Sequence, residues 1–161
     1  MKLPSLQIAN LKAKIPLIQG GMSIRVSTSA LAVPVADGGG IGVIGGSGIL
    51  ADELKEDVLR AKAATDGIVG VNIMYAVKNF YELVIGSIEA GVDLIITGAG
   101  FSRDIFKIGK KYNVPIAMIV SSPTLARLAE KLGAAAIIVE AKEAGGHLGT
   151  DQPLRTIFPP I

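Results

Sequence analysis

The chain contains no cysteine, no tryptophan and one histidine among its 161 residues. Without cysteine it can form neither disulfide bonds nor thiolate metal sites, and a single histidine argues against a zinc site, so no metal is expected. Aromatic residues make up only 4% of the chain, although 50% of its residues are hydrophobic. The core must therefore consist mainly of isoleucine, valine, leucine and alanine, which is typical of parallel strands covered by helices.

Strong charge and long apolar runs are also missing. The formal net charge is +2, and the densest basic cluster, Lys107, Lys110 and Lys111, has the spacing of a solvated helix face. No basic stripe indicates a nucleic-acid partner. No apolar run reaches the roughly 18 residues that suggest a membrane span, and residues 1–4 lack the apolar segment of a signal peptide. We therefore expect a cytoplasmic protein that binds neither nucleic acid nor membranes.

Short apolar runs alternate with amphipathic stretches along the whole chain. The strand candidates are rich in isoleucine and valine and are bounded by glycine, proline or aspartate. They are residues 15–19, 40–44, 68–73, 94–97, 116–120 and 136–139. The helix candidates are residues 29–36, 51–64, 79–90, 103–112 and 124–132. This alternation predicts an α/β protein with a parallel sheet and right-handed crossovers.

Glycine placement bears on whether that sheet is open or closed. The first strand ends in Gln-Gly-Gly-Met-Ser, which does not match the Gly-x-Gly-x-x-Gly of open dinucleotide-binding sheets. Residues 45–48 follow a strand and could cradle a phosphate, although their spacing is loose. Glycines cluster at most strand ends, which favours a TIM (β/α)8 barrel. About six of its eight βα units are present, so we expect one domain over residues 1–161, incomplete at its C-terminus.

The most informative segment is EAKEAGGHLG, residues 140–149, which follows the apolar run 134–139. It places His147 just past a strand end, where such barrels carry their chemistry. Histidine can exchange a proton near neutral pH, and glycines let a flat ligand approach the backbone. The simpler alternative is a glycine-rich turn with an exposed histidine.

Five segments together resemble a known family. They are PLIQGGM (16–22), GGGIG (38–42), GVNIM (70–74), TGAG (97–100) and EAGGHLG (143–149). Their order and spacing are similar to those of the FMN-dependent family that holds nitronate monooxygenase, formerly 2-nitropropane dioxygenase, and type II enoyl-acyl-carrier-protein reductase. The resemblance covers nearly the whole chain. It implies a TIM barrel that binds FMN at the carboxyl ends of its strands and acts on a small molecule.

The resemblance also implies site residues, all of them close to strand ends. Those expected to bind FMN are Gly20, Gly21, Met22, Asn72, Glu140, Gly145 and Gly146. His147 would be the catalytic or substrate-contacting residue. Asn72 suits the polar edge of the flavin because an amide both donates and accepts. Structural alternatives remain open: Asn72 could cap a strand end, Met22 could fill the core, and Glu140 could be a solvated carboxylate.

The expected activity is that of an FMN-dependent oxidoreductase, with nitronate monooxygenase, which oxidises alkyl nitronates with O2, as the first candidate. The alternative is an enoyl-acyl-carrier-protein reductase that uses NAD(P)H. Glu140, where monooxygenases often carry glutamine, favours the reductase. Phe101 and Ser102, where reductases often carry Asn-Pro, favour the monooxygenase. The chain could instead be an inert partial barrel that needs a homo-oligomer or a complementing C-terminal segment. An IMP dehydrogenase-like barrel is also conceivable, but that dehydrogenase needs a catalytic cysteine.

Overall fold

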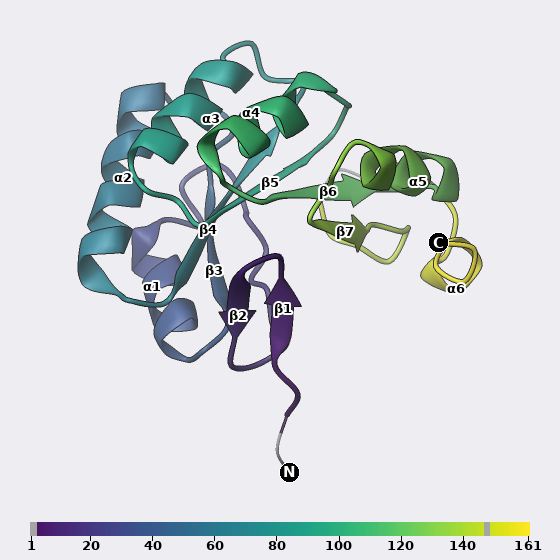
Figure 1. Ribbon diagram of the computed structural model, residues 1–161, viewed down its shortest axis with the longest axis horizontal. Coiled ribbons are helices and arrows are strands. Elements are labelled where there is room, and N and C mark those ends of the chain that lie inside the picture. Colours follow the sequence, from purple (N-terminus) through teal and green to yellow (C-terminus); the bar gives the residue numbers. More distant parts are fainter. Residues whose placement is uncertain (1–2, 147–148) are drawn as a thin grey trace.

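The computed structural model describes residues 3–146 and 149–161. Five strands form one parallel sheet in chain order: β3 (Ile41–Gly45), β4 (Ile68–Met74), β5 (Leu94–Gly98), β6 (Ile116–Val120) and β7 (Ala136–Val139) (Figure 1). The larger helices are α1 (Ser29–Asp37), α2 (Ala51–Ala64), α3 (Phe80–Glu89), α4 (Asp104–Tyr112) and α5 (Pro123–Lys131). A short helix, α6 (Leu154–Ile157), lies near the end of the chain. All ten predicted elements from α1 to β7 agree with these bounds to within one residue.

The first predicted strand, residues 15–19, is wrong as a regular strand. The structure has a single parallel bridge there, between Ile18 and Ile41. Pro16 has no amide hydrogen to donate, and the Leu17 amide bonds locally to the Ile15 carbonyl at 2.9 Å. The segment still runs beside β3, because the Ile41 amide donates to the Leu17 carbonyl at 2.9 Å. It therefore keeps its place next to the sheet although its ladder is interrupted.

An antiparallel hairpin that the sequence did not predict precedes this segment. It consists of β1 (Leu6–Ile8) and β2 (Leu11–Ala13). Its buried residues Ile8 and Ala13 pack in one cluster with the inner-face residues Ile41, Val43, Leu94, Ile96 and Ala117. In Figure 1 the hairpin lies on the other side of the sheet from helices α2–α4. It covers the amino-terminal end of the inner face.

The two faces of the sheet have separate cores. In β4, the outer-face residues Val69, Val71 and Ile73 are fully buried against the helices. Because side chains alternate along a strand, Asn72 points to the inner face. A parallel sheet with helices on its outer face and a second core inside is the architecture of part of a barrel. Within the described ranges, no helix combines the length and apolarity needed to cross a membrane.

A buried carboxylate from α2 caps the start of α1. Thr28, the N-cap residue of α1, makes no side-chain cap hydrogen bond. Asp57 takes this role, since it accepts from the Ser29 amide at 3.1 Å and from the Ser29 hydroxyl at 2.6 Å. Arg60 Nη2 lies 3.0 Å from Asp57 Oδ1, and Asp57 is only 4% exposed. Asp57 therefore joins α1 to α2.

Replacing Asp57 with alanine should lower the free energy of unfolding by about 2–3 kcal/mol, because the half-buried Ser29 donors lose a charged, buried acceptor. Urea denaturation of the full chain measures this loss. The matched control is Glu56→Ala, since the Glu56 side chain is 72% exposed and lies 4.0 Å from Arg60. The control should change stability by less than about 0.5 kcal/mol. Equal losses in both variants would contradict a capping role for Asp57.

Candidate functional site

The loop of residues 20–27 lies directly against the end of β4. The Asn72 Nδ2 donates to the Gly21 carbonyl at 3.4 Å, across 51 residues of sequence. A Cβ atom placed on Gly21 would lie 2.4 Å from the Asn72 Cβ and 3.1 Å from Val43 Cγ1. Real Cβ atoms do not approach so closely, so this contact requires glycine at position 21. The structure thus brings together two of the residues predicted from sequence.

Asn72 has one polar atom without a partner. Its Oδ1 is buried and accepts no hydrogen bond from the part of the chain that the structure describes. Its backbone carbonyl is already used by the Gly46 amide at 2.9 Å. An unpaired buried acceptor costs about 1–3 kcal/mol, and such a group calls for an explanation. The other such atom, Thr97 Oγ1, belongs to a residue that alternates with the inner-face Ile96 and so lies on the outer face of β5.

The predicted glycines at the loop ends leave open backbone. A Cβ atom on Gly20, Gly145 or Gly146 would meet nothing within 4 Å. Met22 is 46% exposed, so it does not fill the core. Open glycine backbone, an exposed thioether and an unpaired amide oxygen at one edge of the sheet fit a flat polar-edged ring such as a flavin.

The glycine-rich segment follows β7 at the same edge of the sheet. The Glu140 amide donates to the Val120 carbonyl at 2.8 Å, which extends the pairing of β6 and β7. The loop is closed by the Lys142 amide on the Gln152 carbonyl at 3.0 Å and by the Leu154 amide on Glu143 Oε2 at 3.0 Å. His147 lies outside the described residues. Strands β5 and β6 separate β7 from β4, so Glu140 shares an edge with Asn72 without being its neighbour.

The candidate phosphate loop of residues 45–48 has a different role. The Gly46 amide donates to the Asn72 backbone carbonyl at 2.9 Å, and Ser47 Oγ accepts from the Met74 amide at 2.8 Å. Ser47 is 2% exposed. A Cβ atom on Gly46 would lie 2.8 Å from Leu54 Cδ2. This segment therefore packs helix α2 against the sheet, and the Gly46 amide and Ser47 Oγ already bond to β4.

Two polar residues that bond to this loop, Gln19 and Ser27, are not among the residues predicted from sequence. Gln19 Nε2 donates to Ser27 Oγ at 2.9 Å, and Ser27 Oγ donates to the Gly20 carbonyl at 2.9 Å. In the sequence, Gln19 stands out only as part of the PLIQGGM segment. A polar amide at the end of an apolar run was the one available signal, because its partners are distant in sequence.

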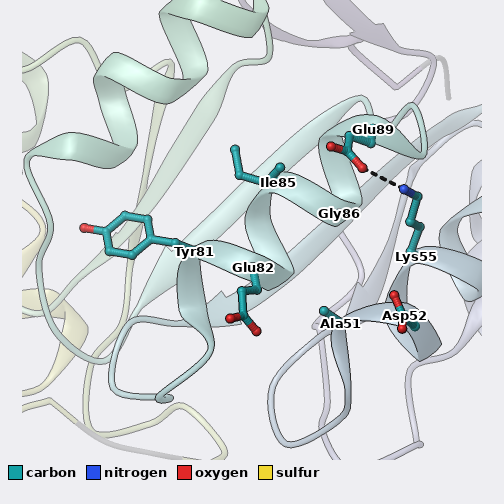
Figure 2. A pocket seen from close by; sticks show the side chains of 8 residues that line it. All are labelled: Ala51, Asp52, Lys55, Tyr81, Glu82, Ile85, Gly86 and Glu89. Atoms are coloured by element: carbon teal, nitrogen blue, oxygen red, sulfur yellow. Dashed lines mark hydrogen bonds and ion pairs between the residues drawn. The ribbon is translucent and has the colours of Figure 1, made fainter.

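Two cavities among the described residues lie away from this site. A groove of about 420 Å³ lies between α2 and α3 on the outside of the sheet (Figure 2). Figure 2 shows the ion pair between Lys55 and Glu89, at 2.6 Å, at one side of that groove. A second cavity of about 240 Å³ lies by the hairpin turn at Ala9 and Asn10.

Comparison with known proteins supports the family resemblance. A model of the nitronate monooxygenase family matches residues 5–83. The structure of FabK from Thermotoga maritima is 34% identical with a TM-score of 0.78, covering 81% of this chain and 42% of that one. Nitroalkane oxidase from Streptomyces ansochromogenes is 21% identical with a TM-score of 0.71, covering 84% of this chain and 48% of that one, which indicates a shared fold.

A curated relative extends the comparison. It is the (3aS,4S,5R,7aS)-5-hydroxy-7a-methyl-1-oxo-octahydro-1H-indene-4-carboxyl-CoA dehydrogenase of Mycobacterium tuberculosis, 28% identical over 134 residues. The alignment covers 83% of this chain and 38% of that protein, so this chain spans less than half the length of the relatives it matches. The structural neighbours are TIM-barrel enzymes, and the sheet described above corresponds to part of such a barrel. The family model at residues 5–83 and these structural neighbours together support the resemblance to the nitronate monooxygenase family over the N-terminal part of such a barrel.

Proposed function

We propose that this chain forms the cofactor-binding region of an FMN-dependent oxidoreductase. The observation that carries the proposal is the buried Oδ1 of Asn72, which has no partner among the described residues. It lies beneath the glycine loop at the carboxyl end of the sheet, next to Gly21. A donor on the edge of a flavin ring would satisfy this oxygen, whereas a purely structural amide would be expected to find a partner within the protein.

The residues would divide the work of holding the cofactor. Gly20, Gly21 and Met22 would lie along the flavin from one side of the sheet edge. Glu140, Gly145 and Gly146 would approach it from the loop after β7. His147 would bind the substrate or take a proton from the carbon next to the nitro group of a nitroalkane, which gives the nitronate. When bound, FMN would supply the electron chemistry, and this chain would bind and orient it.

The first candidate reaction is oxidation of alkyl nitronates with O2. Its support is the family model, which covers the segment that contains the glycine loop and Asn72. O2 consumption in the presence of a nitronate measures this activity directly.

The second candidate is reduction of an enoyl thioester with NAD(P)H as co-substrate. Its support is a group of exposed apolar side chains beside the site: Met22 (46% exposed), Ile24 (69%), Val26 (56%) and Leu50 (69%). Ile24 lies against the loop after β3, 3.4 Å from the Cβ position of Gly48. Such a surface suits an acyl chain better than a small nitro compound. A relative named for a CoA thioester substrate points the same way. Oxidation of NAD(P)H with a crotonyl thioester separates this reaction from the first.

A titration of the full chain with FMN, followed by flavin fluorescence, tests the cofactor. We expect Asn72→Leu to bind FMN at least about 10-fold more weakly than wild type, the effect of one hydrogen bond of roughly 1.4 kcal/mol. Without FMN, the free energy of unfolding should fall by no more than about 1 kcal/mol, because the substitution removes an unpaired acceptor together with one long hydrogen bond to the Gly21 carbonyl.

The control for this titration is Asn10→Ala, at the hairpin turn on the opposite end of the sheet. It should bind FMN as the wild type does. A large loss of stability in Asn72→Leu would instead assign Asn72 to strand-end capping. No flavin binding by the wild-type chain would contradict the proposal and favour an inert partial barrel.

A further inference from the structure

The side chain of Gln19 continues the sheet where the backbone leaves it. The last backbone hydrogen bond of this segment runs from the Gln19 amide to the Ile41 carbonyl at 3.0 Å. Two residues further along β3, the Val43 amide donates to Gln19 Oε1 at 3.1 Å. Gln19 Nε2 donates in turn to the Val43 carbonyl at 3.1 Å. The side-chain amide thus hydrogen-bonds to both the amide and the carbonyl of Val43, which anchors the start of the loop to β3.

Ser27 closes the same loop from its other end. Ser27 is 1% exposed, and its Oγ accepts from the Met22 amide at 2.9 Å and donates to the Gly20 carbonyl at 2.9 Å. Gln19 Nε2 also donates to Ser27 Oγ at 2.9 Å, which joins the two anchors. The Ser27 amide donates to the Met22 carbonyl at 2.9 Å. Backbone groups of both Gly20 and Met22 are therefore held by these two residues.

The loop is also pressed against the sheet. The Gly45 amide donates to the Ser27 carbonyl at 2.8 Å. A Cβ atom on Gly45 would lie 2.5 Å from the Met22 carbonyl oxygen. The Met22 carbonyl therefore sits between the Ser27 amide and the end of β3. In contrast, Ile24 and Val26 at the outer part of the loop are 69% and 56% exposed and give it little packing.

We propose that Gln19 and Ser27 are positioning residues that hold Gly20, Gly21 and Met22 in the conformation that binds the cofactor. This inference rests on the proposed function. Neither residue needs to touch the flavin, because their hydrogen bonds go to the backbone of the loop. A glycine-rich segment without them would populate many conformations. Since only the competent fraction binds, the apparent affinity for FMN would fall in proportion to that fraction.

The test combines amide hydrogen exchange of the full chain without FMN and a titration with FMN. The variants are Ser27→Ala and Gln19→Met. The matched control is Ser87→Ala, because Ser87 is also fully buried and its hydroxyl donates to the Leu83 carbonyl at 2.7 Å, within α3. We expect the Met22 amide to exchange about 10-fold faster in Ser27→Ala, and FMN to bind about 10-fold more weakly in both variants.

In the Ser87→Ala control, the exchange rate of the Met22 amide and the affinity for FMN should stay within about 2-fold of wild type. This should hold even if the control lowers the melting temperature as much as Ser27→Ala does. Wild-type FMN affinity in Ser27→Ala and Gln19→Met, or unchanged Met22 exchange in Ser27→Ala, would overturn the positioning role while leaving the proposed function intact. Absence of FMN binding by the wild type would contradict the proposed function itself, and with it any role of this loop in holding a flavin.

Discussion

Replacing Gly42 with alanine is expected to lower the free energy of unfolding by about 3 kcal/mol or more. Gly42 lies in the middle of β3, where α1 crosses the sheet. A Cβ atom there would lie 1.9 Å from the Ala32 carbonyl oxygen and 2.6 Å from the Ala32 carbonyl carbon. These are backbone atoms, so no side-chain rotation can relieve the overlap. The whole of α1 would have to move away from the sheet, and Ala32, which is fully buried, would lose its packing.

The matched variant is Gly86→Ala in α3. The nearest atoms to a Cβ at position 86 are the Ala51 carbonyl oxygen at 3.7 Å and Lys55 Cβ at 3.9 Å, which is ordinary contact. Because alanine has a higher helix propensity than glycine, the free energy of unfolding of this variant should rise by about 0.5–1 kcal/mol. Urea denaturation should show that Gly42→Ala lowers the free energy of unfolding and that Gly86→Ala raises it. Comparable stability of Gly42→Ala and wild type would show that α1 does not approach β3 as closely as described.

Replacing Gly21 with alanine is expected to weaken FMN binding by about 100-fold, a change of roughly 2.7 kcal/mol. The added methyl group would lie 2.4 Å from the Asn72 Cβ and 3.1 Å from Asn72 Nδ2. The loop and Asn72 would have to separate, which would break the arrangement proposed to bind the flavin. The free energy of unfolding should also fall, by about 1–3 kcal/mol, because the overlap must be relieved within packed structure.

Gly20→Ala separates cofactor contact from packing. A Cβ on Gly20 would meet nothing within 4 Å, so its stability without FMN should match or slightly exceed that of wild type. If the flavin lies on the Gly20 backbone, this variant binds FMN more weakly at unchanged stability. Fluorescence titration and urea denaturation of both variants give the comparison. Wild-type FMN affinity in Gly21→Ala would place the cofactor away from this loop.

The sequence alone was sufficient for most of the architecture. Strands and helices follow from periodicities that are read over a few neighbouring residues, and α2 was predicted with its observed bounds, Ala51–Ala64. The family resemblance pointed to Gly21 and Asn72 as one site, and the structure places them in contact. The hairpin β1–β2 was missed because each strand has three residues, too few for a clear alternation.

Tertiary structure alone decided which residues hold the site and the helices in place. Gln19 meets Val43 across 24 residues, Asp57 meets Ser29 across 28, and Asn72 meets Gly21 across 51. No local pattern identifies such pairs, because the sequence around each of these polar residues would suit an exposed side chain as well as a buried one. Likewise, residues 45–48 look like a phosphate loop until the partner of Gly46 is known. The sequence therefore determined the elements and their order, because these depend on local periodicity. The fold determined the polar contacts at the site, because these depend on which strand ends meet.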